Sequence, residues 1–184
     1  MGVGDSAGKS LAKICAVLVF CWPIQAKSDG LETFGDIAQI AIPAIALVAS
    51  GAKGDYLGAA QLGVTTGVTL GITHGLKIAI DRRRPNGGGQ SFPSGHTAAA
   101  FSGAAYLHFR YGWEYGLPAY AVASVVAISR VKADKHHVTD VLGAAAIAIV
   151  TAYVFTDSLN DRVTIIPYAQ FRKKNFGIIA KIKF

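Results

Sequence analysis

The chain has 184 residues, of which 52% are hydrophobic and only 16% are charged, and its formal net charge is +7. This length predicts one domain, and the charged fraction lies below the roughly 25% of ordinary soluble domains. Positive charge could indicate a nucleic-acid partner, but no pattern of a nucleic-acid-binding module accompanies it. The composition therefore argues against nucleic acid and favours a membrane environment.

The N-terminal segment has the pattern of a secretory signal peptide. Two lysines precede an apolar run from Ile14 to Ile24, and Gln25-Ala26 then leads into a polar stretch. This order of charged, apolar and small residues predicts cleavage after Ala26, so that residues 1–26 are a signal peptide. An uncleaved first helix is the alternative for the same residues.

Beyond residue 30, apolar segments alternate with short polar joints, and this pattern predicts an all-α fold. The helices are expected near residues 33–51, 55–81, 95–111, 114–130 and 137–156. Among them, only the uncharged run 56–76 reaches the roughly 20 residues of a bilayer span, and the others span only with charged boundary residues at the interface. Many Gly, Ala, Ser and Thr residues suit close helix contacts in a membrane. We therefore expect a membrane-embedded helical bundle with five spans over residues 27–158, with a soluble helical domain as the alternative.

The first motif that suggests chemistry runs from Lys77 to Pro85. Lys77 and Arg84 are seven residues apart, which is two helical turns, so on a continuous helix both point the same way. Pro85 would end that helix. Arg82 and Arg83 would lie on other faces of the helix and contact lipid headgroups or solvent. The motif therefore predicts a pair of cations at the end of an apolar helix.

The second motif is Pro93-Ser94-Gly95-His96. Pro93 bends the chain, and Ser94 is a natural N-cap for a helix that begins near His96. Free backbone N–H groups at such a helix start bind phosphate oxygens. This motif favours a phosphate site to which Ser94 and the Gly95 backbone contribute.

The third motif runs from Ser129 to Asp140 and contains Arg130 and His136. His136 and Asp140 are four residues apart on the expected helix, so the carboxylate can reach the imidazole, fix its tautomer and favour its charged form. His137 is rotated by about 100° on the same helix and cannot share that geometry. We therefore take His136 as the reactive histidine.

The tail from residue 159 to residue 184 is basic and has β-like alternation of side chains. A turn at Lys173-Lys174-Asn175 would fold it into a hairpin. We assign it no function.

Together, the three motifs supply three cations, a helix start, two histidines and a carboxylate. Transfer of a phosphoryl group needs charge stabilisation, a nucleophile and a proton donor, and these residues provide all three with no metal-ligand set and no cofactor. In this combination the chain resembles the type 2 phosphatidic acid phosphatase (PAP2) superfamily, which includes bacterial class A acid phosphatases and vanadium haloperoxidases. The resemblance covers roughly residues 35–156 and is carried by the patterns Lys-x6-Arg-Pro, Pro-Ser-Gly-His and Ser-Arg-x5-His-x3-Asp.

The resemblance implies a metal-independent phosphatase that forms a phosphohistidine on His136, activated by Asp140. His96 would protonate the leaving group, which separates the general acid from the nucleophile. The phosphate oxygens would be held by Lys77, Arg84, Ser94, the Gly95 backbone and Arg130.

The order of the spans predicts where the site faces. If the first segment crosses outward, the chain lies outside near residue 27, and five further spans place both 82–94 and 131–137 outside. The Lys-rich tail then lies inside, in agreement with the positive-inside tendency. We expect a bacterial inner-membrane enzyme with a periplasmic site, acting on a lipid phosphate or diphosphate whose headgroup stays open. The alternatives are a soluble periplasmic acid phosphatase and a non-catalytic phospholipid-binding membrane protein.

Activity should survive EDTA, because cationic side chains stand where Mg²⁺ stands in other phosphoryl-transfer sites. Vanadate and inorganic phosphate should inhibit competitively, since both would occupy the site for the phosphate oxygens. Phosphate release with and without chelator measures the first effect, and inhibition kinetics measure the second. Loss of activity in EDTA that Mg²⁺ restores would contradict the expected site.

Overall fold

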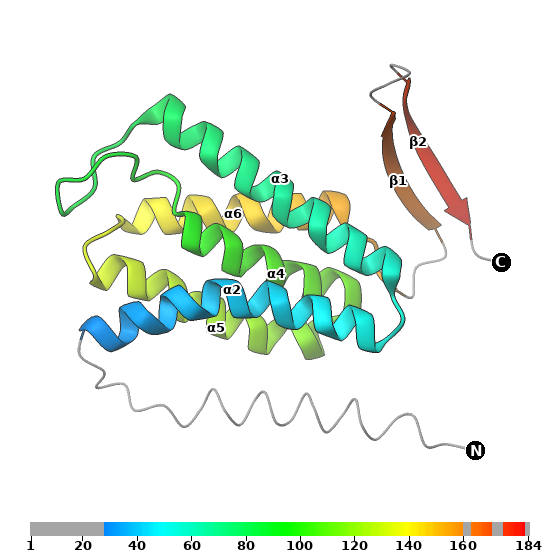
Figure 1. Cartoon of the computed structure of the whole chain (residues 1–184), viewed down its shortest axis with the longest axis horizontal. Helices are drawn as coiled ribbons and strands as arrows, with labels where there is room; N and C mark the ends of the chain where they lie inside the picture. The colour runs from blue at the N-terminus through cyan, green and yellow to red at the C-terminus, as the bar shows by residue number, and fades with distance from the viewer. Residues whose placement is uncertain (1–27, 160–162, 171–174, 183–184) are drawn as a thin grey trace.

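The computed structural model describes residues 28–159, 163–170 and 175–182 of the chain. Its helices are α2 (Ser28–Ala52), α3 (Tyr56–Ile80), α4 (Gly95–Tyr111), α5 (Trp113–Lys132) and α6 (Val138–Phe155) (Figure 1). The five predicted helices are confirmed, and α2 begins earlier than expected. The predicted signal peptide, and the alternative of a retained first helix, lie outside the described residues.

Successive helices run in opposite directions along one bundle (Figure 1). The first residues of α2, α4 and α6 therefore lie at the same end as the last residues of α3 and α5. The loops 81–94 and 133–137 also lie at this end, on the left of Figure 1. We call it the motif end, because all three sequence motifs meet there, and we call the opposite end the far end.

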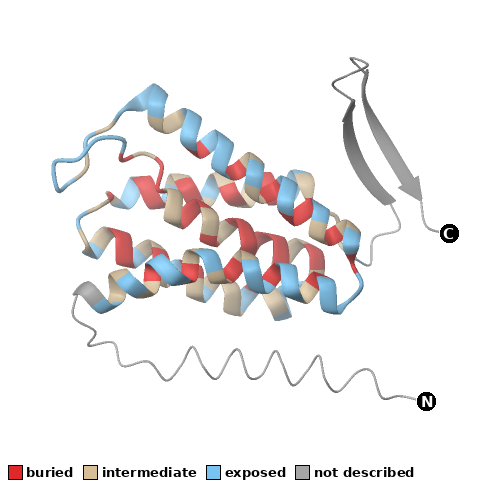
Figure 2. Cartoon of the chain, viewed as in Figure 1, coloured by how far each residue is buried: buried red, intermediate tan, exposed pale blue. Residues whose placement is uncertain are grey.

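Helix α4 packs against all four other helices, and its small residues make this possible. Among its buried residues are Ala98, Ala100, Ala104 and Ala105. A Cβ atom at Gly103 would lie 2.8 Å from the backbone nitrogen of Pro43 in α2, so only glycine permits this close approach. Figure 2 shows the buried residues along the faces that the helices turn toward one another. Close contact through small residues is the usual way in which helices associate within a membrane.

Helices α3 and α6 are joined by hydroxyl contacts on their facing sides. The Oγ1 atoms of Thr65 and Thr156 lie 3.2 Å apart, and those of Thr69 and Thr151 lie 2.5 Å apart. All four threonines are buried. Such bonds between membrane helices contribute about 1 kcal/mol each. They hold α3, which carries one of the motif cations, against the rest of the bundle.

Two of the described helices are long and apolar enough to cross a membrane by length and composition, over Gly30–Ala52 and Val138–Phe155. The run 56–76, which we expected to be the best span, is not among them because its glycines, threonines and Gln61 lower its hydropathy. Helix α4 has only 17 residues. Hydropathy alone therefore does not support five spans among the described helices.

The C-terminal residues form β1 (Val163–Gln170) and β2 (Asn175–Ile182). The two strands pair antiparallel, with Val163 opposite Ile182 and Gln170 opposite Asn175. The expected turn at Lys173-Lys174-Asn175 is not tested, because residues 171–174 lie outside the described part of the chain and Asn175 is the first residue of β2.

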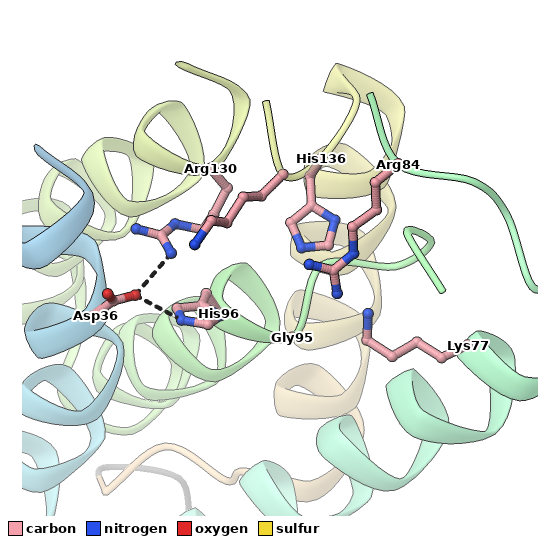
Figure 3. Close-up of a pocket in the computed structure, with 8 residues that line it drawn as sticks. Asp36, Lys77, Arg84, Gly95, His96, Arg130 and His136 are labelled. Atoms are coloured by element: carbon pink, nitrogen blue, oxygen red, sulfur yellow. Dashed lines mark hydrogen bonds and ion pairs between the residues drawn. The ribbon is translucent and has the colours of Figure 1, made fainter. Parts of the chain in front are cut away.

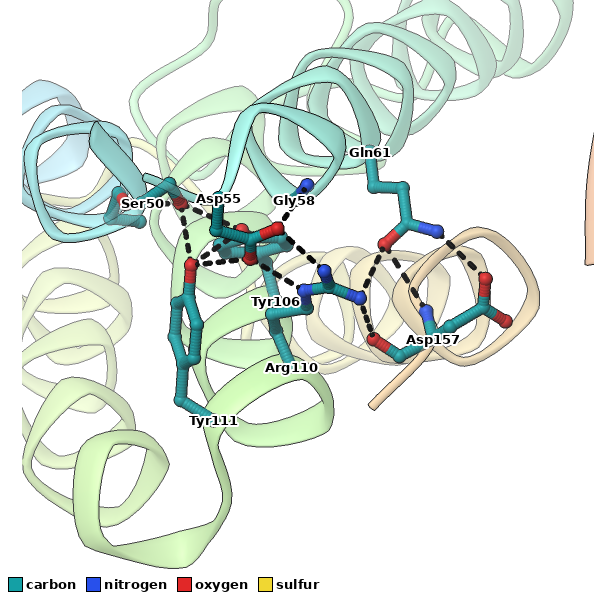
Figure 4. A network of polar contacts seen from close by, with 9 residues as sticks. Ser50, Asp55, Gly58, Gln61, Tyr106, Arg110, Tyr111 and Asp157 are labelled. Carbon is teal, nitrogen blue, oxygen red and sulfur yellow. Dashed lines mark hydrogen bonds and ion pairs between the residues drawn. The ribbon is translucent and has the colours of Figure 1, made fainter. Parts of the chain in front are cut away.

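The far end of the bundle is closed by a buried ion pair between Asp55 and Arg110 (Figure 4). The Arg110 guanidinium donates to both carboxylate oxygens, at 2.7 and 2.6 Å, and the Tyr111 hydroxyl donates to the same carboxylate at 2.8 Å. Asp55 also caps α3 by accepting from the backbone nitrogen of Gly58 at 2.9 Å. Burial raises the pKa of Asp55, but these hydrogen bonds lower it by more. The resulting pKa is about 2, so the carboxylate stays charged.

The same guanidinium also reaches the chain that follows α6. Arg110 donates to the carbonyl of Asp157 at 2.8 Å, and Gln61 donates to the carboxylate of Asp157 at 2.8 Å. The Tyr111 hydroxyl oxygen also lies 2.9 Å from the hydroxyl oxygen of Ser50, at the end of α2. The contacts therefore link α2, α3 and α4 to the end of α6. We call this group the far-end clamp: Ser50, Asp55, Gln61, Arg110, Tyr111 and Asp157.

Replacing Arg110 by leucine should lower the free energy of unfolding by about 3–5 kcal/mol, because it leaves the buried Asp55 carboxylate without its partner. Glu114→Gln removes an exposed charge at the same end and should change stability by less than about 0.5 kcal/mol. Denaturant unfolding in detergent, followed by circular dichroism, compares the two variants. If both lost stability equally, the ion pair would not be what holds the far end.

Candidate active site

A cavity of about 210 Å³ lies at the motif end (Figure 3). Eight site residues were predicted from the sequence. Six of them line this cavity, and Ser94 and Asp140 do not. The lining comes from four helices and two loops and consists of Asp36, Lys77, Arg84, Gly95, His96, Arg130, Lys135 and His136. Basic side chains dominate this lining, so the cavity is suited to an anion.

His136 lies in the loop before α6 and is only 4% exposed. Its Nδ1 is 2.7 Å from the backbone oxygen of Ser91. Because a carbonyl can only accept, Nδ1 carries the proton and Nε2 keeps its lone pair. Burial, followed by the charges of Lys77 and Arg84, lowers the pKa of His136 to about 4. The imidazole is therefore neutral at pH 7, which is the state that nucleophilic attack requires.

Asp140 does not hydrogen-bond to His136, contrary to the sequence prediction. Helix α6 begins only at Val138, so residues 136 and 140 do not share a helical turn, and Oδ2 of Asp140 lies 3.7 Å from Nδ1 of His136. The same oxygen accepts from the Ser91 hydroxyl at 2.5 Å and from the backbone nitrogen of His137 at 2.8 Å. Ser91 thus orients the histidine with its carbonyl and holds Asp140 with its hydroxyl. Asp140 acts on the imidazole through its charge.

His137 is the N-cap residue of α6 and lies outside the helix in which we expected it. Its Nε2 is 3.2 Å from the backbone oxygen of Arg83, and the residue does not line the cavity. The structure therefore agrees with the choice of His136 over His137, but the helical-phase reason for that choice was wrong.

Each of the three motif cations is anchored by an oxygen of the protein. Lys77 donates to the backbone oxygen of Gln90 at 2.8 Å, and Nε of Arg84 donates to that of Gly89 at 3.0 Å. Arg130 extends from the end of α5, is almost fully buried, and donates to the backbone oxygen of Glu32 at 2.7 Å. These bonds fix the positions of the charges and leave further donors of each side chain for an anion.

Helix α3 ends at Ile80, within one residue of the expected end at 81, but it does not continue to Pro85 as the alignment of Lys77 with Arg84 assumed, and this changes the role expected of Arg82. Arg84 consequently reaches the cavity from a loop. Arg82 was expected to face headgroups or solvent, but its guanidinium donates to the Asp140 carboxylate at 2.9 Å. The Arg83 side chain is exposed, as predicted. Arg82 is therefore the charge partner of Asp140.

Ser94 was predicted to contact phosphate, but its hydroxyl serves the helix. The residue is fully buried, and its Oγ accepts from the backbone nitrogen of Thr97 at 3.5 Å and from the Thr97 hydroxyl at 3.1 Å. The N-cap prediction is confirmed. Gly95 and His96, the first residues of α4, line the cavity in its place.

Sequence reasoning missed two residues of the cavity, Asp36 and Lys135. Asp36 directly precedes the uncharged run 37–52, and Lys135 directly precedes the reactive histidine, where it pairs with Glu32 of α2. Both are charged residues at the ends of apolar segments that reach the motif end. That position was the available signal, but no spacing rule relates Asp36 of α2 to motifs that begin at Lys77, Pro93 and Ser129.

Comparison with known proteins points to the same family as the motifs. The family model of the PAP2 superfamily matches residues 86–163. A lipid A 4'-phosphatase of Helicobacter pylori is 34% identical over 158 residues, which cover 77% of this chain and 79% of that protein. A lipid A 1-phosphatase of Porphyromonas gingivalis is 44% identical over 78 residues, which cover 40% of this chain and 17% of that protein.

Two crystal structures share the fold. A transmembrane PAP2-type phosphatidylglycerolphosphate phosphatase from Bacillus subtilis aligns with a TM-score of 0.58 at 20% identity, over 83% of this chain and 86% of that one. LpxE from Aquifex aeolicus aligns with a TM-score of 0.61 at 19% identity, over 84% of this chain and 98% of that one. At these identities the likeness speaks for the fold alone.

Arg82→Ala should lower turnover of a short-chain phosphate ester by at least about tenfold, roughly 1.4 kcal/mol of barrier. The reason is that it leaves the buried Asp140 carboxylate without its cation. Arg83→Ala removes a neighbouring exposed guanidinium and should keep near wild-type turnover. Steady-state phosphate release from both variants, with unfolding midpoints to confirm folding, makes the comparison. Equal turnover in the two variants would show that the Arg82 contact does not matter for the reaction.

Proposed function

Because the chain belongs to the PAP2 superfamily and is a phosphatase of that family, we propose that it removes phosphate from a membrane lipid through a phosphohistidine on His136. The observation that carries the proposal is a neutral imidazole of His136 in a cavity that also holds three motif cations and His96. The favoured substrate is a phosphate monoester of a lipid A-type glycolipid, since a lipid A 4'-phosphatase is the relative that matches over most of its own length.

In the first step, Nε2 of His136 attacks phosphorus and the bond between phosphorus and the ester oxygen breaks. Lys77, Arg84 and Arg130 hold the other phosphate oxygens and stabilise the charge that they carry in the transition state. The start of α4 adds backbone N–H groups on the same side. His96 donates a proton to the ester oxygen, so the lipid leaves as an alcohol.

In the second step, water attacks the phosphorus of the phosphohistidine. His96, now neutral, accepts a proton from that water, the bond between phosphorus and His136 breaks, and inorganic phosphate leaves. While phosphorylated, the ring keeps its proton on Nδ1 and is positively charged. The carboxylate of Asp140, 3.7 Å from Nδ1, favours this charged ring.

The outer surface of the bundle supports a position within the membrane. Large apolar side chains point outward on α2, α5 and α6, among them Ile37, Ile40, Val48, Leu117, Leu142 and Val150. Exposed apolar surface combined with a core of small residues suits a bundle whose surroundings are lipid. All five helices span the membrane in this proposal, and the short α4 does so because its neighbours surround it.

The far end has the character of a membrane interface, and we place it on the cytoplasmic side. Tyr56, Trp113 and Tyr153 lie there and are 82%, 62% and 73% exposed. Amphipathic aromatic side chains concentrate at such interfaces, and Lys53 at the same end agrees with the positive-inside tendency. The motif end then faces the periplasm of the inner membrane.

The two alternatives from the sequence fit less well. A soluble periplasmic acid phosphatase would use the same cavity, but exposed apolar side chains on three helices disfavour it. A phospholipid-binding protein without turnover would need the cations, but it would not need a buried histidine kept neutral with a free lone pair.

The test is phosphate release by the purified protein from lipid A, phosphatidic acid, phosphatidylglycerol phosphate and undecaprenyl diphosphate. Lipid A should be the best substrate. His136→Ala should remove turnover by several orders of magnitude, because the attacking atom is lost, whereas His137→Ala should keep most of it. After brief reaction with ³²P-labelled substrate and an alkaline quench, wild-type protein should carry label and His136→Ala should not.

If the protein released phosphate from none of the four lipids, the proposed function would be refuted. Equal losses in the two histidine variants, or label that persists in His136→Ala, would refute the assignment of the nucleophile while leaving the function in place.

A further inference from the structure

Asp36 of α2 is the one carboxylate among the residues that line the cavity. Its Oδ1 is 2.9 Å from Nε2 of His96 and 2.8 Å from a terminal guanidinium nitrogen of Arg130 (Figure 3). A single oxygen atom is thus shared between the histidine at the start of α4 and the arginine at the end of α5. Asp36 belongs to none of the three sequence motifs.

The first turns of α2 are fitted closely to this part of the site. A Cβ atom at Gly35 would lie 2.2 Å from the Ser129 hydroxyl and 2.8 Å from the Arg130 guanidinium, so a larger residue would push the helix away. The backbone oxygen of Glu32 accepts from Arg130 at 2.7 Å. Two features besides Asp36 itself therefore hold α2 against the site and fix where its carboxylate stands.

The charges around His96 explain what a carboxylate at this point would do. Burial, and then the positive charges of Arg130 and Lys135 in the same cavity, lower the pKa of His96 and so disfavour a second proton on it. A general acid must carry that proton before it can give it away. The negative charge of Asp36 lies at hydrogen-bond distance from the His96 ring and counteracts the effect of the two cations. The other nearby carboxylate, Glu32, is paired with Lys135.

We propose that Asp36 is a positioning residue for the leaving-group step, which holds the ring of His96 by Nε2, stabilises its protonated form and leaves Nδ1 to donate to the ester oxygen. This inference rests on the proposed function and extends it to a residue outside the motifs. Arg130 keeps its bonds to the Glu32 carbonyl and to Ser129 when the carboxylate is lost, so Asp36 serves His96 more than it serves phosphate binding.

The test compares two substrates that differ in their need for a proton. A short-chain phosphatidic acid has an alcohol leaving group that must be protonated, whereas the nitrophenolate of p-nitrophenyl phosphate leaves without a proton. Asp36→Asn should lower kcat at least about tenfold on the first substrate and about twofold or less on the second. Asp36→Glu should recover part of the loss. Asp134→Asn is the matched control, since Asp134 is an exposed carboxylate at the same end and is absent from the cavity lining.

Two further readouts separate proton donation from structural support. In Asp36→Asn, the fall of kcat on the alkaline side should move to lower pH, because the protonated imidazole loses its counter-charge. In a His96→Ala background, Asp36→Asn should have no further effect on the phosphatidic acid. If Asp36→Asn does not fold, Asp36→Ser replaces it. The quantity compared is then the ratio of kcat on phosphatidic acid to kcat on p-nitrophenyl phosphate.

Equal losses of kcat on both substrates, with a raised KM and an unchanged pH profile, would show that Asp36 supports phosphate binding by Arg130. That result would overturn the inference. Failure of the wild-type protein to hydrolyse these two substrates and every lipid of the panel above would overturn the proposed function together with this extension. Turnover of both substrates by wild type, with no loss in Asp36→Asn, would overturn the extension alone.

Discussion

Repulsion among like charges is the constraint on which the motif end depends. Lys77, Arg84, Arg130 and Lys135 line one cavity of about 210 Å³, and their charges repel one another. Each is therefore held by an oxygen of the protein, Lys77 and Arg84 by carbonyls of the loop 81–94 and the other two by carboxylates of α2. The long loop and the first turns of α2 are thus needed to keep the cations in place. Positive charge that is held in advance stabilises a phosphoryl transition state without rearrangement at the moment of reaction.

The two ends of the bundle differ in how their charges are balanced. At the far end, the carboxylate of Asp55 and the guanidinium of Arg110 meet in a buried, fully hydrogen-bonded pair. At the motif end, basic residues outnumber carboxylates, so the balance depends on an anion from outside. The far-end clamp can therefore fix the helices relative to one another without a ligand. Because α4 packs closely against the other four helices, the helix positions fixed at the far end are also fixed at the cavity.

Much of the fold followed from the sequence, since apolar segments separated by polar joints predicted five helices, with the boundaries of α4 as observed. The motifs also identified most of the cavity. The failures occurred where helices end. Because α3 stops at Ile80 and α6 starts at Val138, helical spacing placed Arg82 on the wrong side and predicted a direct bond between His136 and Asp140, whose Nδ1 and Oδ2 atoms lie 3.7 Å apart. Asp36 could not be found from spacing at all, because only the packing of α2 against α4 and α5 brings it to residues 60 and 94 positions away.

The absence of a bond between His136 and Asp140 has a consequence for the proposed reaction. Nδ1 of His136 donates to the Ser91 carbonyl, and this bond and the Asp140 charge both raise the pKa of the ring, but burial and the charges of Lys77 and Arg84 lower it by more. The resting imidazole therefore stays neutral and nucleophilic among its cationic neighbours. Once Nε2 is bonded to phosphorus, the ring becomes positive, and the charge of Asp140 at 3.7 Å then favours it. A charge at this distance stabilises the phosphorylated ring more than the free one, and it is this difference between states that lowers a barrier.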